Sequence, residues 1–124
     1  MAETHSFVTI KLPVRGFHYW IDAPQTVGFL SYQHRHTFTI RASVYVRHGD
    51  RCVEFVLFRQ LLLKYLTETY PVIFDGYNFG MESCENLSKA MHDWLVSQKF
   101  SVRFVSFSED EEFEGGVETV QIKS

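Results

Sequence analysis

The chain has 124 residues, of which 45% are hydrophobic and 16% aromatic, and its formal net charge is −3 at pH 7 with neutral histidines. This length predicts a single domain, residues 1–124, with enough apolar side chains for one core. No Lys/Arg-rich run predicts a nucleic-acid partner, and no apolar stretch approaches the roughly 18 residues that span a membrane. Two distant cysteines, Cys52 and Cys84, without a signal peptide fit a reducing compartment, so we expect a soluble cytoplasmic protein.

The first part of the chain alternates apolar and polar residues, which is typical of strands. One strand is expected over about residues 5–12, and the alternation continues more weakly to residue 19. A loop follows over about residues 22–33. A second strand is expected over about residues 34–47, followed by turn residues at 48–50.

The apolar period then becomes helical. It predicts a helix that begins near Phe55 and ends before Pro71, because the residue before a proline resists helical geometry. Residues 72–80 are expected to be a connection. Ser83 is expected to be the N-cap of a second helix. The apolar stripe of that helix consists of Leu87, Met91, Trp94 and Leu95.

Two further strands are expected near the C-terminus, one over residues 101–107 and one over about residues 117–122. Gly115 and Gly116 are expected to form the turn before the last strand. The predicted order is therefore ββααββ. Runs of strands around a helix pair favour an α+β fold, with an antiparallel four-stranded sheet and two helices on one face.

The triplet His34-Arg35-His36 opens the second predicted strand. Because successive strand side chains alternate between faces, His34 and His36 share one face, about 7 Å apart, and Arg35 lies on the other. His18 precedes them by sixteen residues. If it lies on the neighbouring strand, it completes a three-histidine zinc site with an open fourth position, as in catalytic zinc centres. The alternative is that these histidines are ordinary polar residues at a strand start.

Three other side chains are candidates for chemistry. Glu85 begins the second helix, where it either belongs to a capping segment or accepts two hydrogen bonds from a planar heterocycle. Glu109 follows the third strand and is either a second ligand-binding carboxylate or part of a solvated acidic run. Cys84 follows the N-cap, where a thiol pKa can fall. A nucleophilic role for it needs a base, and His92 lies eight residues on.

These features together resemble the tetrahydropterin synthases of the tunnelling fold, the 6-pyruvoyl- and 6-carboxy-tetrahydropterin synthases. His18 and the His34-Arg35-His36 triplet are similar to the family's strand-end histidine and His-Gly-His triplet. The segment Glu82-Ser83-Cys84-Glu85-Asn86-Leu87 is similar to its Pro-Thr-x-Glu-Asn-Leu helix start, and Glu109 to its pterin-binding glutamate. The ββααββ order also matches, and the resemblance spans about residues 5–120.

The resemblance implies that His18, His34 and His36 bind Zn²⁺. It implies that Glu85 anchors the 2-amino-pyrimidinone edge of a pterin and that Glu109 is the second carboxylate. It also implies a small heterocycle as the partner, and a symmetric homo-oligomer whose active sites form between subunits.

The chain departs from the family at its acid–base groups. The family carries a cysteine about four residues before the triplet, where this chain has Leu30, and an Asp-His pair where Asp75 is followed by no histidine. One hypothesis is a divergent zinc lyase acting on dihydroneopterin triphosphate or a related purine-derived compound, with Tyr32, Asp75 or a zinc-bound water as replacement base. A second is a protein that binds a pterin, purine or nucleotide without transforming it. A third is a small α+β domain without metal.

Overall fold

The structure, a computed structural model, describes residues 2–47 and 52–120, so the turn expected at 48–50 lies outside the described residues. Its elements are β1 (Ser6–His18), the 3-10 helix η1 (Gln25–Ser31), β2 (His34–Val46), α1 (Phe55–Thr69), β3 (Val72–Ile73), β4 (Gly76–Gly80), α2 (Cys84–Ser97), β5 (Ser101–Glu109) and β6 (Phe113–Glu118). Within these described residues, six strands form one sheet in the order β3-β4-β1-β2-β5-β6. The expected α+β class is confirmed. The sheet has two strands more than the predicted four, and β4 runs parallel to β1.

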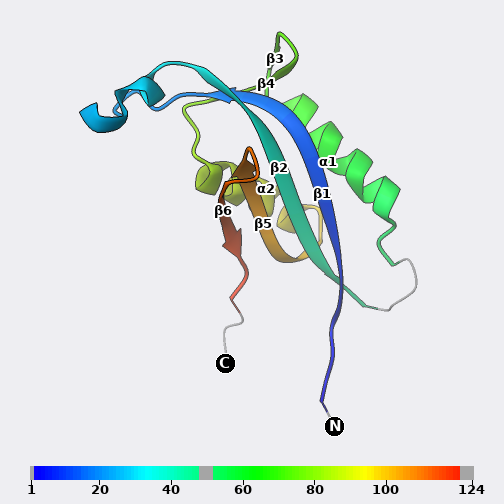
Figure 1. Ribbon diagram of the computed structural model, residues 1–124. Coiled ribbons are helices and arrows are strands. Elements are labelled where there is room, and N and C mark those ends of the chain that lie inside the picture. The colour runs from blue at the N-terminus through cyan, green and yellow to red at the C-terminus, as the bar shows by residue number, and fades with distance from the viewer. Residues whose placement is uncertain (1, 48–51, 121–124) are drawn as a thin grey trace.

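The hairpin of β1 and β2 is the longest feature of the sheet, and Figure 1 shows the two strands side by side as one curved ribbon. They pair antiparallel from Ser6 opposite Val46 to His18 opposite His34. The first strand therefore passes through Pro13 instead of ending at residue 12. Proline is tolerated in a strand that has no neighbour on its N–H side, and β4 joins β1 only from Gly16 onward.

Both helices pack on the same side of the sheet, behind the β1–β2 ribbon in Figure 1. The core consists of alternate residues of the strands and of one apolar stripe from each helix. Its fully buried members include Leu12, Phe38, Ile40, Leu62, Leu66, Leu87, Met91, Leu95, Val105 and Phe107. Each such side chain contributes roughly 1.5–3 kcal/mol through burial. The opposite faces of β1 and β2 carry polar residues such as Thr9, Lys11, Thr39 and Arg41, which explains the alternation seen in the sequence.

The second helix begins where the sequence predicts. The Ser83 side chain accepts a hydrogen bond from the Asn86 N–H at 3.1 Å and so satisfies one of the free N–H groups of the first turn. This cap fixes Cys84 and Glu85 in that turn, beside the end of β5. None of the helices in the described ranges is long and apolar enough to cross a membrane.

Two expectations about glycine-rich segments were wrong. Residues 72–80 form the short β3–β4 hairpin, in which Gly76 lies against the backbone carbonyl of Arg15, where a Cβ would clash. Gly115 and Gly116 lie inside β6, which starts at Phe113 instead of residue 117. In both places glycine permits a close approach of neighbouring atoms, which a sequence pattern does not distinguish from a turn. Residues 121 and 122 of the predicted last strand lie outside the described residues.

Candidate metal centre and adjoining cleft

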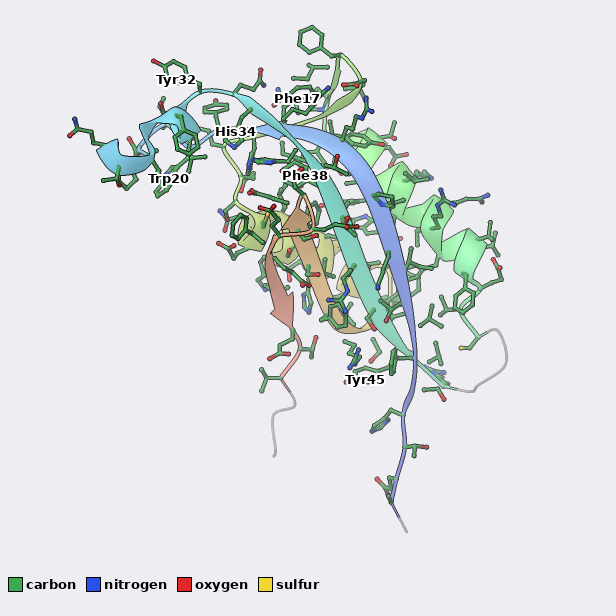
Figure 2. All side chains as sticks on the ribbon, viewed as in Figure 1. Phe17, Trp20, Tyr32, His34, Phe38 and Tyr45 are labelled. Carbon is green, nitrogen blue, oxygen red and sulfur yellow. The ribbon has the colours of Figure 1, made fainter. Side chains whose placement is uncertain are left out.

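The three predicted histidines converge at the open end of the β1–β2 hairpin. His18 ends β1 and lies opposite His34, the first residue of β2, and His36 lies two positions further along the same face. One ring nitrogen from each residue lies within 4.8 Å of the others. Figure 2 shows His34 at this end of the hairpin. The juxtaposition expected from the sequence is therefore confirmed.

The Nδ1 atom of each histidine faces an oxygen. For His18 the oxygen is the Glu82 carbonyl at 3.2 Å, and for His34 it is the Tyr32 carbonyl at 2.9 Å. His36 Nδ1 lies 2.6 Å from the Asp110 carboxylate. Because these oxygens accept hydrogen bonds, each Nδ1 donates and carries a proton. The three Nε2 atoms can then offer lone pairs to a common ligand, as metal-binding histidines do.

The Nε2 atoms of His18 and His36 are buried and have no hydrogen-bond partner among the described residues. The Glu109 carboxylate lies 3.0 Å from His18 Nε2 and 3.6 Å from His36 Nε2. When Nδ1 carries the proton, Nε2 of each ring is an acceptor, and it then faces another acceptor, the Glu109 carboxylate. Such an arrangement requires a proton or a cation between them. A divalent metal ion satisfies all the acceptors at once, so the donor set fits a metal ion.

The charge states of the site also suit a cation. Burial lowers the pKa of His34, and the neighbouring His18 and His36 lower it further, so its imidazole is neutral at pH 7, the form that binds metal. The pKa of Glu109 is lowered by its contact with His18, against the opposing effect of burial. Glu109 is therefore an ionised carboxylate beside the His18 and His36 rings.

A cleft of about 550 Å³ adjoins the histidines. This volume lies within the usual range of small-molecule sites. Its polar lining includes His18, His34, Glu85 and Glu109, so the structure brings both predicted carboxylates to the metal-binding side chains. Its apolar lining includes Trp20, Leu30, Met81 and Phe113.

Glu85 is positioned by the first turn of α2 and by the strand beside it. A negative charge is favoured at this place because the free N–H groups of the helix start carry partial positive charge. Its carboxylate lies against Gly115 of β6, where a Cβ would overlap it. The glycine thus makes room for the carboxylate at the cleft wall.

The structure does not support a reactive Cys84. Its thiol is buried, and Sγ lies 3.7 Å from Glu109 Oε1. Burial raises the pKa of Cys84 to about 12, and the charge of Glu109 contributes in the same direction. The lowering that a helix start can cause is outweighed here, because desolvation and a neighbouring carboxylate both oppose the thiolate. The suggested base, His92, is instead hydrogen-bonded to Asp93 and Thr119.

The two proposed replacement bases lie away from the cleft lining of the described chain. The Tyr32 side chain is 77% exposed, and only its backbone carbonyl contacts a histidine. Asp75 forms an ion pair with Arg15 and lies 3.8 Å from Arg35. Arg35 projects from the face of β2 opposite to the histidines, so one chain does not bring Asp75 to them.

Asp110 is the site residue whose part the sequence did not reveal. In the sequence it is one member of the acidic run that starts at Glu109. Its contact with His36 depends on the β2–β5 ladder, which pairs Phe38 with Glu109 and so carries the next residue to the start of β2. The contact could have been predicted if the third predicted strand had been placed beside the second in the sheet.

The chain matches no family model, and no curated protein is significantly similar to it. A proposal about its function therefore rests on the geometry of its own side chains. That geometry combines three convergent imidazoles with a cleft whose lining includes Glu85, Glu109 and apolar side chains.

Proposed function

We propose that this protein is a zinc-dependent lyase of the tetrahydropterin synthase type, acting on dihydroneopterin triphosphate or a related pterin or purine-derived compound. The observation that carries this proposal is the convergence of three imidazole nitrogens at the wall of a cleft that also holds Glu85 and Glu109. A metal ion and a heterocycle could thus be bound side by side.

His18, His34 and His36 would hold the ion. Three imidazole ligands with a fourth position open to the cleft are typical of catalytic zinc. When bound, Zn²⁺ supplies Lewis acidity to a substrate oxygen or lowers the pKa of a bound water. The chain's own contribution is to orient the three rings through their Nδ1 contacts, which leaves the Nε2 atoms free to bind the ion.

Glu85 and the cleft walls would hold the heterocycle. A carboxylate accepts two parallel hydrogen bonds from an amino-pyrimidinone edge, as it does from a guanidinium. Trp20 and Leu30 would cover the apolar faces of the ring. Glu109, ionised and next to His18, would be the second carboxylate, between the ring and the metal-binding histidines.

The architecture supports a tunnelling-fold-like scaffold. The β1–β2 hairpin, the two helices on one face and the β5–β6 hairpin give the ββααββ core, to which β3 and β4 are added. Such a sheet has open edges that a second copy can pair with. We propose a cytoplasmic homo-oligomer in which the exposed Tyr32 and Asp75 of one copy reach the cleft of another and act as acid–base groups.

The alternative is a binding protein that holds a pterin, purine or nucleotide unchanged. It is favoured by the placement of the candidate acid–base groups within one chain. Asp75 pairs with two arginines, Tyr32 is exposed, and the pKa of Cys84 is raised. In this case the histidines and Glu85 would retain their ligands, while no proton would be moved.

The test is turnover of dihydroneopterin triphosphate by the purified protein with Zn²⁺, followed by chromatography of the products. The lyase is expected to convert the substrate, and His34→Ala is expected to abolish conversion. His5→Ala is the matched control, since His5 contacts Tyr45 far along the hairpin from the site. Unchanged substrate that co-purifies with the protein would establish the binding protein instead. Absence of both zinc binding and heterocycle binding would contradict both functions.

A further inference from the structure

The three histidines differ in what holds their Nδ1 atoms. His18 and His34 donate to backbone carbonyls, which a substitution cannot remove. His36 donates to the side chain of Asp110, at 2.6 Å. The orientation of His36 therefore depends on one replaceable group.

Asp110 is itself fixed by two further hydrogen bonds. Its second oxygen, Oδ1, accepts from the Thr37 N–H at 2.9 Å, and its own N–H donates to the Thr37 carbonyl at 2.8 Å. These bonds extend the β2–β5 ladder by one step beyond the pair of Phe38 and Glu109. One oxygen of the carboxylate thus accepts a hydrogen bond from a backbone N–H, and the other accepts one from the His36 ring.

The backbone conformation of Asp110 also suits an aspartate at this position. Its φ angle is +50°, in the left-handed region that most side chains avoid. Asp and Asn are among the residues that tolerate this region best. The turn after β5 therefore accepts a short acidic side chain at this position, directed back toward the start of β2.

We infer that Asp110 is a positioning residue that holds His36 as the Nδ1–H tautomer and aims its Nε2 at the bound metal ion. The inference rests on the proposed metal site. Glu109 and Asp110 then have different parts although they are adjacent. Glu109 lies on the Nε2 side of His36 and Asp110 on the Nδ1 side.

Asp110→Asn is the most informative variant, because it keeps the shape of the side chain and the left-handed backbone. Its amide has one acceptor where the carboxylate has two. The Thr37 N–H needs that acceptor, so the NH₂ group faces His36 and Nδ1 becomes the acceptor. The proton of His36 then moves to Nε2, which removes the lone pair that binds metal.

Two measurements follow. The ¹⁵N shifts of His36 in the metal-free protein, at a pH at which the ring is neutral, are expected to report the Nδ1–H tautomer in the wild type and the Nε2–H tautomer in Asp110→Asn. Competition with a chromophoric chelator is expected to show Zn²⁺ affinity weakened by about 10–100-fold, the usual effect of losing a partner of a metal-binding histidine. Thermal unfolding of both proteins confirms that the variant is folded.

Glu112→Gln is the matched control, since it removes the same charge from the same turn without touching His36. Equal Zn²⁺ affinity in Asp110→Asn and Glu112→Gln, with an unchanged His36 tautomer, would overturn the inference. If the wild-type protein binds no Zn²⁺, the proposed function fails. The His36 tautomer in the two metal-free proteins then still decides whether Asp110 positions the ring.

Discussion

The Glu109 carboxylate lies 3.0 Å from Nε2 of His18, at the point where the cluster of histidines meets the cleft. The Nδ1 atom of the same ring is occupied by the Glu82 carbonyl. The contact therefore joins two acceptors unless a proton or a metal ion lies between them. This relationship connects the metal-binding side chains to the surface on which a ligand would lie.

The first prediction concerns metal binding and stability. Zn²⁺ is expected to raise the melting temperature of the wild-type protein, because an ion that binds only the folded state stabilises it by about 2.7 kcal/mol at 100 times its Kd. Chelation should reverse the shift, and His34→Ala should remove it. Differential scanning calorimetry with and without EDTA measures the effect. An identical shift in His34→Ala would mean that the ion binds elsewhere.

The second prediction concerns the wall that holds Glu85. Gly115→Ala places a methyl group against the Glu85 carboxylate and the Cβ of Cys84, so the carboxylate must move. We expect weaker binding of a pterin such as neopterin. The loss of stability should be modest, because the Glu85 side chain can rotate away, whereas the Cys84 Cβ at 3.2 Å has to shift slightly. Fluorescence titration with neopterin measures the affinity.

Gly28→Ala is the control for this prediction, since a Cβ at Gly28 meets no atom within 4 Å. Glu85→Ala provides the second comparison and should weaken binding at least as strongly as Gly115→Ala. Full affinity in both Glu85→Ala and Gly115→Ala would exclude Glu85 as the anchor.

The hairpin and the histidine cluster could be predicted because their signals are local. Strict alternation places His34 and His36 on one face whatever the rest of the sheet does. Convergence with His18 needs only an antiparallel neighbour, and the loop between the two strands allows one. Helix α2 was predictable for a similar reason, since Ser83 and the apolar stripe act within a few turns.

The parts that sequence patterns missed depend on contacts between distant segments. The β3–β4 hairpin is short, and its glycines resemble loop residues until the backbone of Arg15 is seen next to Gly76. The contact of Asp110 with His36 spans 74 positions and exists only because β5 pairs with β2. Strand order of this kind is set by packing of the whole core, which local periodicity does not encode.

The third prediction concerns the thiol at the cleft. Since burial and Glu109 raise the pKa of Cys84 to about 12, its thiolate is about one part in 10⁴ at pH 8. We expect the native protein to leave Cys84 unmodified by iodoacetamide between about pH 7 and 9, with a rate that rises as the pH approaches the raised pKa. Mass spectrometry of digested Cys52→Ser protein isolates this thiol from the exposed one. Rapid alkylation at pH 7, under native conditions, would restore the nucleophile hypothesis.

The fourth prediction separates the lyase from the binding protein. Asp75 is exposed and paired with Arg15, whose hydrogen bond lowers the pKa of the Asp75 carboxyl, so it is ionised at neutral pH. In the proposed lyase it would leave Arg15 to act as a base in the cleft of a neighbouring copy. Asp75→Asn is expected to reduce turnover by about 10²-fold or more, the usual contribution of a general base. The melting temperature should change little, because exposed ion pairs contribute little to stability.

Glu68→Gln is the control for this fourth prediction, because Glu68 is also an exposed acid in an ion pair, with Lys64 at 3.8 Å. Mixing Asp75→Asn with His34→Ala subunits extends the experiment to the oligomer. If Asp75 serves the cleft of a neighbouring copy, mixed assemblies contain some clefts with both wild-type groups and regain part of the activity that each variant lacks. Full turnover in Asp75→Asn alone would remove this residue from catalysis. A loss that mixing does not restore would place its action within its own chain.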